Sequence, residues 1–199
     1  MAELEKDMLG RYSEEIADKR ILAHNNVFVS IYARNCEVRK IDRGTAKAFL
    51  DRYHDLGDTG SRYRYGLFVT RRGHSSIEVG TMVAVATFSA ARKWDKAGST
   101  VRSCEWVRYA SLPDVRISGG MGKVLKAFLE EVRPDDVMSY ADSRWSDGDV
   151  YRKLGFTEED PKIFPNGSKS LKFRLKLTDY RSSPDDMTES TTDLTSSYE

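Results

Sequence analysis

The sequence has little cysteine and no long apolar run. Its 199 residues include two cysteines, Cys36 and Cys104, which lie far apart and form no CxxC pair. A disulfide framework and a paired-cysteine zinc site are therefore not expected, and the three histidines show no metal spacing. No apolar stretch reaches about 18 residues, the length that a membrane-spanning helix requires. The polar start of the chain is unlike a signal peptide. These absences predict a cytoplasmic protein without membrane contact and with reduced, structural thiols.

Charge of one sign is also scarce, since 32 Lys and Arg face 31 Asp and Glu for a net charge of +1. The balance is uneven along the chain. Residues 180–199 carry one arginine and five acids, a net of −4, which leaves +5 for residues 1–179. A mildly basic body is compatible with a polyanionic partner, so DNA binding stays open. The last twenty residues include nine Ser or Thr and are expected to be disordered.

The length indicates one main domain with two appendages. We expect an N-terminal amphipathic helix within residues 1–24, where Leu4, Met8, Tyr12 and Ile16 recur every four residues. It would be either a loosely attached element or a homodimer contact. The main domain is expected over residues 25–178, followed by an acidic Ser/Thr-rich tail over 179–199.

The pattern of the main domain alternates between helical and strand-like segments. Strands are predicted at 27–33, 65–70, 77–88 (with a bulge at Gly80), 102–112, 137–141 and 171–177. Helices are predicted at about 44–53 (capped by Asp42), 124–132, and from a cap at Ser146 or Asp147 to Lys153. Residues 89–99 are predicted to be a polar loop. It is interpreted as solvated surface with Trp94 folded back, or alternatively as a lid or nucleic-acid contact. This order indicates an α+β or mixed α/β fold.

A glycine-rich turn opens the helix that contains residues 124–132. The segment 116–123 reads Arg-Ile-Ser-Gly-Gly-Met-Gly-Lys, with three glycines in four positions. Such a turn can aim successive backbone N–H groups at one point, and the helix dipole adds positive potential there. The segment therefore predicts a phosphate or pyrophosphate site. The alternative is a tight strand-to-helix connection without a ligand.

A second motif follows in the expected order. Residues 150–156 read Val-Tyr-Arg-Lys-Leu-Gly-Phe and come after a strand and a short helix. Together the two motifs resemble the acyl-CoA-binding core of the GNAT acetyltransferase superfamily over roughly residues 26–178. The resemblance implies a central, mostly antiparallel sheet with one parallel splayed pair, flanked by helices. The family's Gln or Arg at the start of the glycine turn falls on Ile117 here, and Arg116 stands one place earlier.

The resemblance also implies a cofactor and an activity. It predicts that acetyl-CoA, or another acyl-CoA, binds with its pyrophosphate on the backbone of the glycine turn, at Ile117, Ser118, Gly119, Gly120, Met121, Gly122 and Lys123. Tyr151 would then protonate the departing CoA thiolate, and the acyl group would pass directly to an amine acceptor. That acceptor would be a small molecule, a protein or a nucleic acid. Tyr151 as a packing residue is the alternative.

A narrower likeness concerns GNAT-like proteins of bacteriophages. It rests on Glu105-Trp106-Val107-Arg108, the glycine turn, and residues 139–148. The phage Mom protein, which modifies adenine in DNA, looks like a distant relative with a similar layout. The likeness implies a phage-associated enzyme, and the second hypothesis is a Mom-like modification of adenine in DNA. A third hypothesis is a non-catalytic binding module on the same scaffold.

Three further residues are candidates for the catalytic site. His54 follows a helix and is interpreted either as a base or as a surface histidine at a helix end. Asp142, with Arg144, follows a buried strand and would orient or deprotonate an amine, or else serve as a cap or ion-pair partner. Arg108 is expected on the same strand face as Cys104 and Trp106, binding either substrate or an acid such as Asp142.

Overall fold

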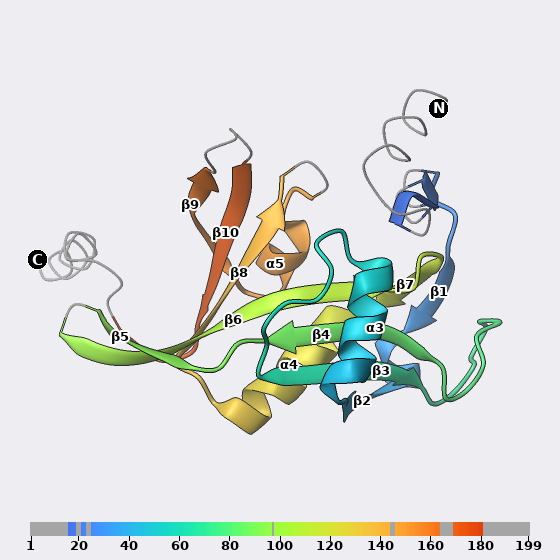
Figure 1. Ribbon diagram of the computed structural model, residues 1–199, viewed down its shortest axis with the longest axis horizontal. Helices are drawn as coiled ribbons and strands as arrows, with labels where there is room; N and C mark the ends of the chain where they lie inside the picture. Colours follow the sequence, from blue (N-terminus) through green and yellow to red (C-terminus); the bar gives the residue numbers. More distant parts are fainter. Residues whose placement is uncertain are drawn as a thin grey trace, which may run out of the picture.

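The computed structural model describes residues 16–18, 21–22, 25–96, 98–143, 146–163 and 169–180, and these form a mixed α/β fold around one large sheet (Figure 1). The elements are β1 (Val29–Tyr32), η1 (Ala33–Asn35), β2 (Cys36–Lys40), α3 (Arg43–Tyr53), β3 (Tyr63–Val69), β4 (Met82–Phe88), β5 (Arg92–Lys96), β6 (Ser99–Ser111), β7 (Val115–Ser118), α4 (Gly120–Val132), β8 (Asp136–Asp142), α5 (Asp149–Lys153), β9 (Thr157–Ile163) and β10 (Lys169–Lys176). None of the described helices is long and apolar enough to cross a membrane.

The large sheet is mostly antiparallel. Its strand order is β2-β3-β4-β6-β8-β10-β9, and β5 pairs with β6 outside this path. Within it, β6 and β8 run parallel, while the other neighbours are antiparallel. A separate two-stranded parallel ribbon joins β1 to β7. The predicted fold class is therefore confirmed, including its parallel pair.

The parallel pair separates partway along its length. Residues of β6 and β8 are in register from Ser103 with Asp136 as far as Trp106 with Ser139. Beyond that point β6 continues to Ser111 beside β4, and β8 continues to Asp142 beside β10. In Figure 1, β8, β10 and β9 fan away from the long β6. The two strands therefore leave a gap at the sheet centre, and the functional site is assembled next to it.

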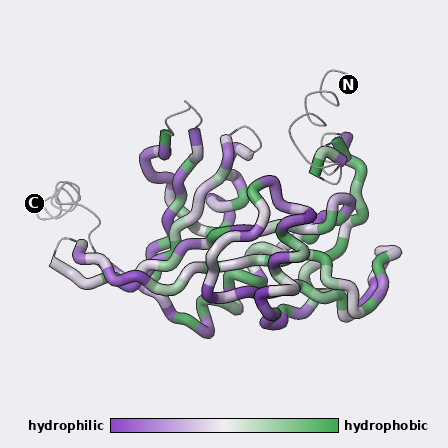
Figure 2. Tube along the Cα trace, viewed as in Figure 1, coloured by the Kyte–Doolittle hydropathy of each residue, from purple (hydrophilic) through white to green (hydrophobic). Residues whose placement is uncertain are grey.

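The two faces of the sheet are covered by different helices. On one face α4 packs its apolar side into the larger core, where the Phe88 and Phe128 rings stack with centroids 3.9 Å apart. On the other face α3 buries Phe49 and Leu50 against Val85 and other small residues. Figure 2 shows the most hydrophobic segments gathered at the centre of the fold. Burial on both faces holds the central strands, and hence the gap, in place.

A bulge at Val107 changes the alternation of side chains along β6. Trp106 is opposite Phe88, but Arg108 is opposite Thr87, so an extra residue is inserted between them. Trp106 and Tyr109 accordingly pack on the α4 face, whereas Ala110 packs on the α3 face. The expectation that Arg108 shares a face with Trp106 is wrong, because strict alternation fails across a bulge.

Two predicted boundaries are also wrong. The strand predicted over 77–88 begins at Met82, because Gly80 has φ +90° and lies in a turn that closes on Val69. The bulge in this strand is at Val83, which is the extra residue of β4 between the partners of Leu67 and Phe68 on β3. Residues 92–96, predicted as loop, form β5, and Trp94 is 51% exposed rather than folded back. Strands β2, β7 and β9 were not anticipated, because the apolar alternation of β2 and β7 falls in strands of only five and four residues and β9 is mostly charged.

Helix starts are partly as predicted. Asp42 caps α3 by accepting a hydrogen bond from the Thr45 N–H at 2.9 Å. The cap of α5 is Gly148, with φ +82°, instead of Ser146 or Asp147. Gly155 is left-handed just after α5, as expected. Most of the N-terminal helix, Arg144, Trp145 and the tail from residue 181 lie outside the described residues.

Gly148 is a position where only glycine fits, and we predict a large cost for Gly148→Ala. The new Cβ would lie 2.1 Å from Cζ of the fully buried Phe173, and φ is positive. We expect a loss of about 3 kcal/mol or more in the free energy of unfolding, measured by urea denaturation.

Gly80→Ala is the matched control, because Gly80 also has positive φ but no atom within 4 Å of the added Cβ. Its expected cost is about 1 kcal/mol. Equal losses for the two variants would contradict the packing around Gly148.

Candidate functional site

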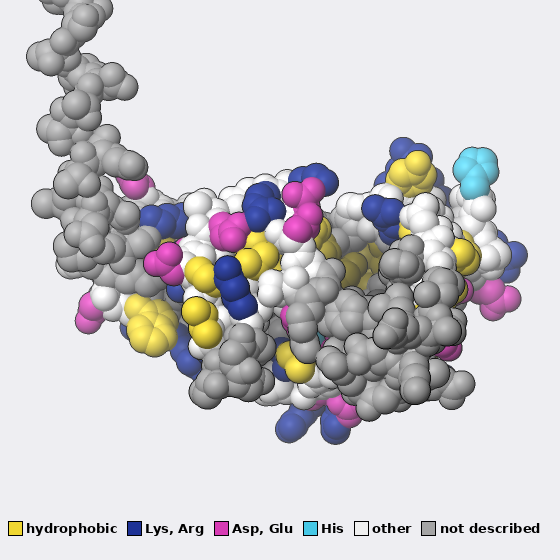
Figure 3. All heavy atoms as spheres, turned by 90° about the horizontal axis from the view of Figure 1, so that it is seen from above, with side chains coloured by type: hydrophobic (Ala, Val, Ile, Leu, Met, Phe, Trp, Pro, Cys, Tyr) yellow, Lys and Arg dark blue, Asp and Glu magenta, His cyan; other side chains and the backbone are white. Residues whose placement is uncertain are grey.

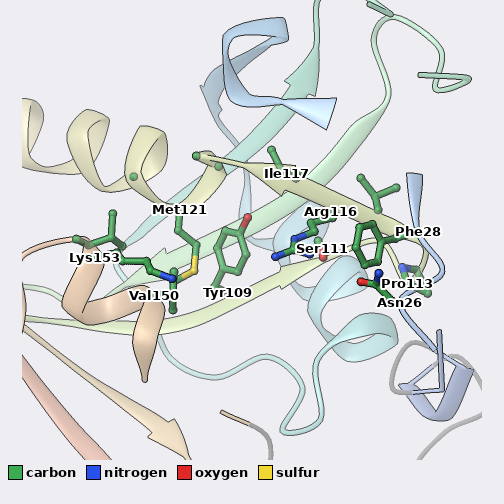
Figure 4. A pocket seen from close by; sticks show the side chains of 15 residues that line it. Asn26, Phe28, Tyr109, Ser111, Pro113, Arg116, Ile117, Met121, Val150 and Lys153 are labelled. Carbon is green, nitrogen blue, oxygen red and sulfur yellow. The ribbon is translucent and has the colours of Figure 1, made fainter. Parts of the chain in front are cut away.

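A cavity of about 560 Å³ opens where β6, β7, α4 and α5 meet (Figure 4). Its wall is mainly apolar, with two cationic side chains and the backbone of the glycine turn. The lining residues are Asn26, Phe28, Tyr109, Ser111, Pro113, Val115, Arg116, Ile117, Gly119, Gly120, Met121, Gly122, Val150, Lys153 and Leu154. Such a lining suits a ligand with an apolar or amide-containing arm and an anionic group.

Backbone N–H groups at the start of α4 face this cavity without partners. Gly119 is the cap residue, with φ +77°, and the first helical bond runs from the Lys123 N–H to the Gly119 carbonyl at 3.0 Å. In the described part of the chain, the N–H groups of Gly120, Met121 and Gly122 donate to no protein acceptor. Unpaired donors at the positive end of a 13-residue helix favour an anion.

Two of the glycines allow neighbouring elements to approach the turn closely. A Cβ on Gly120 would lie 2.8 Å from Ile117 Cγ2 and 3.1 Å from the Tyr109 hydroxyl. A Cβ on Gly122 would lie 3.1 Å from Cδ2 of Leu154, the C-cap residue of α5. The glycines thus bring β6, β7 and α5 against the start of α4, which forms the cavity wall.

Arg116 and Lys153 supply positive charge at the cavity. The Arg116 guanidinium lies 4.9 Å from the centroid of the Phe28 ring, and Figure 4 shows the two side chains together. The Lys153 ammonium lies 3.1 Å from the Asp149 carboxylate, one turn earlier on α5. Arg116 was not among the predicted ligands, although its position one place before the expected one was a signal.

Not every residue of the predicted phosphate turn reaches the cavity. Gly119, Gly120, Met121, Gly122 and Ile117 line it, and Ser118 does not. The Lys123 ammonium instead binds the carbonyl oxygens of Ala33, at 2.9 Å, and Cys36. Lys123 therefore ties α4 to the chain between β1 and β2, and neither of its polar groups is available to a ligand.

Tyr151 lies at the inner end of the gap between β6 and β8. Ser139 Oγ is 2.9 Å from the Tyr151 hydroxyl and 3.0 Å from the Trp106 carbonyl oxygen. Because a serine hydroxyl has one proton, both bonds form together only if Ser139 donates to the carbonyl and accepts from Tyr151. Trp106 and Ser139 are the last paired residues of the two strands. The phenol is thus held where the strands part.

The Tyr151 ring itself is core. It stacks on Phe173 with centroids 4.9 Å apart, it is 9% exposed, and its side chain does not line the cavity. Burial raises the pKa of the Tyr151 phenol above its ordinary value. The group therefore stays protonated at neutral pH and can only donate a proton. To act as a proton donor, Tyr151 would have to turn its hydroxyl proton from Ser139 Oγ toward a ligand in the gap.

Tyr109 is a site residue that sequence reasoning missed. Its ring lines the cavity, and its hydroxyl points toward the glycine turn (Figure 4). Burial raises the pKa of Tyr109, so its hydroxyl also stays protonated. The one signal in the sequence was its position on the predicted strand, directly after Arg108, because neighbouring strand residues point to opposite faces of a sheet.

His54 and Arg108 are on the α3 face of the sheet, away from the cavity. The His54 Nδ1 accepts a hydrogen bond from the Leu56 N–H at 3.1 Å. Neutral His54 therefore carries its proton on Nε2, and that nitrogen is not ready to take another. Arg108 donates to the carbonyls of Gly57, at 3.0 Å, and Val107. The structure brings these two residues near one loop but not to the glycine turn.

Asp142 ends β8, three residues beyond the last pairing with β6. It is opposite Ser170 of β10, and its carbonyl accepts from the Ser146 N–H at 3.0 Å. Its side chain is half-buried and has a partner. No ion pair joins Arg108 to Asp142 in the described part of the chain. The acids close enough to stabilise the charge of Arg108 are Glu105 and Asp58.

Other reactive groups are absent from the described site. Both cysteines are free and buried, and burial raises the pKa of the Cys104 thiol to about 11. Neither is a thiolate near neutral pH, in keeping with the structural role expected. Among the described residues, no group of three His, Cys, Asp or Glu is placed to hold a metal ion.

Comparisons with known proteins give remote structural likenesses. No protein-family model matches the sequence, and no curated protein matches it. The chain is similar to an aminoglycoside N(6')-acetyltransferase from Legionella pneumophila, at 13% identity and a TM-score of 0.47, over 71% of this chain and 92% of that one. It is also similar to a GNAT-family acetyltransferase from Bacillus cereus, at 13% identity and 0.46, over 72% and 99%. FeeM, an N-acyl amino acid synthase from uncultured soil microbes, is similar at 13% identity and a TM-score of 0.46, over 76% of this chain and 97% of that one. Likenesses this distant say nothing about substrates, so a functional proposal has to rest on the site itself.

The half-buried phenol of Tyr109, whose pKa is raised by desolvation, predicts a loss of stability in alkali. Because its pKa is raised in the folded state, the folded chain keeps a proton that the unfolded chain loses above about pH 10. Stability is therefore full below pH 10 and falls as pH rises further. Between pH 9 and pH 11, the free energy of unfolding of Tyr109→Phe should fall by about 1 kcal/mol less than that of the wild type, as measured by urea denaturation. Identical pH slopes would contradict a buried hydroxyl at this position.

Proposed function

We propose that the protein is an acyltransferase that takes an acyl group from acyl-CoA and passes it to an amine. The observation that carries the proposal is the set of unpaired N–H groups of Gly120, Met121 and Gly122, which line a cavity beside the gap between β6 and β8. A pyrophosphate with an elongated amide-containing arm matches this combination of helix N-terminus and adjacent strand edge.

The residues present fit acyl-CoA as the donor substrate. The pyrophosphate would bind the three helix amides, with Arg116 and Lys153 adding positive charge at the rim. The apolar wall, including Met121, Val150 and Leu154, would contact the pantetheine arm. When bound, this donor supplies a thioester whose carbonyl carbon is open to attack by an amine.

The chain's own contribution to the chemistry would be to place the thioester and donate a proton. Attack by the neutral amine forms a C–N bond and breaks the C–S bond; the amine nitrogen releases one proton to solvent, and the thiolate takes up one proton as it leaves. The Tyr151 hydroxyl is a protonated donor at the inner end of the gap. His54 and Asp142 are not assigned as the base, since the Nδ1 of His54 is already engaged and Asp142 lies at the far end of β8.

The first test removes one amide donor from the glycine turn. Met121 is at the second position of α4, where its N–H makes no intrahelical bond, so Met121→Pro deletes a donor without breaking the helix ladder. We expect about a 10-fold or greater loss of CoA affinity in isothermal titration calorimetry, since a hydrogen bond to a charged group is lost.

Met121→Ala is the matched control, because it removes the side chain and keeps the amide. Melting temperatures of both variants report whether the fold survives. If the two variants bind CoA equally well, or if the wild type binds no CoA, the proposed site is wrong.

The second test concerns the proton donor. Tyr151→Phe should lower kcat at least about 10-fold while leaving CoA affinity nearly intact, because the phenol would act on the leaving thiolate. Release of free CoA thiol measures turnover. Tyr140→Phe, on β8 but with its ring against Lys162 instead, is the control. An unchanged kcat in Tyr151→Phe would assign the residue to packing alone.

A further inference from the structure

Buried polar atoms without partners gather on the α3 face of the sheet. In the part of the chain that the structure describes, five buried side-chain nitrogen or oxygen atoms have no hydrogen-bond partner. Four of them belong to one cluster: Asp58 Oδ1, Ser61 Oγ, Arg64 Nε and Thr87 Oγ1. We call this group, together with Arg108, the α3-face cluster. Unpaired polar atoms are costly and uncommon in folded proteins, so four together need an explanation.

The register of three strands brings the cluster together. Arg64 of β3 is directly opposite Thr87 of β4, and Thr87 is directly opposite Arg108 of β6. Directly opposite side chains on one face lie about 5 Å apart at Cβ. The row therefore crosses the sheet beside the bulge at Val107, where β6 leaves β8.

A loop of residues 57–61 closes over this row. Arg64 Nη2 donates to the Ser61 carbonyl, and Arg108 Nε donates to the Gly57 carbonyl at 3.0 Å. The Asp58 N–H is tied to Asp51 of α3 at 2.8 Å, which leaves its carboxylate on the side of Arg108. The loop thus adds a buried carboxylate oxygen and a buried hydroxyl to those of the strand row.

Thr87 gives the sharpest indication of a ligand. Its side chain is 0% exposed, yet its hydroxyl has no partner, although valine would fill the same volume without a polar atom. Beside it, Arg64 Nε needs an acceptor and Asp58 Oδ1 needs a donor, while the guanidinium of Arg108 is held by the carbonyls of Gly57 and Val107. Arginine is suited to planar bidentate recognition of carboxylate and phosphate. A ligand with an oxyanion and an amine satisfies both needs at once.

The cluster and the donor cavity lie on opposite faces of the same strand. Tyr109 faces the cavity, and its neighbour Arg108 belongs to the α3-face cluster. Both residues follow Trp106, the last residue paired with β8. A donor and an acceptor would therefore approach the gap from the two sides of β6.

We propose that the α3-face cluster is the acceptor subsite and that it selects amines bearing an oxyanion, either a carboxylate or a phosphate. This inference rests on the proposed acyl transfer and adds the class of acceptor. Arg108 and Arg64 take the oxyanion, the Thr87 and Ser61 hydroxyls complete its hydrogen bonds, and Asp58 accepts from the amine.

The test compares matched acceptors with acetyl-CoA as donor. Lysine is set against cadaverine, which lacks its carboxylate, and O-phosphoethanolamine against ethanolamine, which lacks its phosphate. We expect the oxyanion-bearing member of at least one pair to have a KM at least about 10-fold lower, as the loss of a charge-assisted hydrogen bond implies. The pair that responds identifies carboxylate or phosphate.

Variants connect the preference to the cluster. Thr87→Val, which keeps the side-chain volume, should raise KM for the preferred acceptor about 10-fold and leave KM for the matched acceptor without an oxyanion unchanged. Ser61→Ala should act in the same direction. Ser75→Ala is the matched control, because Ser75 lies in an exposed turn and bonds the Arg72 carbonyl. A purely structural role would not divide the acceptors in this way.

The outcomes separate the two proposals. If acyl-CoA binds in calorimetry but the paired acceptors share one KM, or if Thr87→Val only stabilises the fold because the cluster holds ordered water, the acceptor subsite is overturned and acyl transfer stands. If no acceptor is turned over, thermal shift decides. A rise in Tm with lysine or O-phosphoethanolamine in wild type, but not in Thr87→Val, supports the subsite; no rise overturns it. Absent acyl-CoA binding overturns the proposed function instead.

Discussion

The hydrogen bonds of Ser139 fix the point at which the central strands separate. Ser139 connects the Trp106 carbonyl of β6 to the Tyr151 hydroxyl of α5. At the paired end of the same strands, the fully buried Asp136 accepts from Ser103 and forms a 3.0 Å ion pair with Arg174. A buried charge is tolerated when it is paired and hydrogen-bonded in this way. The parallel pair is therefore held at its base and released at Trp106, and the cavity beside the start of α4 lies next to that release.

The bulge at Val107 gives β6 a different partner on each face. Tyr109 meets the glycine turn on the α4 face, while Arg108 meets the loop after α3 on the other. A regular strand would have placed the arginine in the apolar core beside Phe128, where burial would be costly. On the face seen in Figure 3, side chains of both charge signs are interspersed. Selectivity would then come from a few enclosed groups and not from a broad surface field.

The sequence predicted the fold class and the glycine turn, because glycine spacing and apolar periodicity act locally. It placed the glycine turn at the start of α4, although the helix begins at Gly120 and not near Val124, and it singled out Tyr151, which lies beside the gap. It could not predict that Lys123 turns to the carbonyls of Ala33 and Cys36, since that contact joins segments about 90 residues apart. The sequence also could not predict the sheet face on which Arg108 lies, because a bulge depends on the partner strand and does not show in the periodicity of one strand alone.

The ribbon of β1 and β7 shares no ladder with the main sheet, yet it forms one wall of the donor cavity through Phe28, Val115 and Ile117. β7 joins α4 directly through Gly119, and the ammonium of Lys123 on α4 binds the carbonyls of Ala33 and Cys36, which follow β1. The width of the cavity can therefore change through small shifts of this ribbon without breaking any bond of the large sheet. Under the proposed function, substitutions in these two short strands would change how the donor is held, while the ladders of the large sheet stay intact.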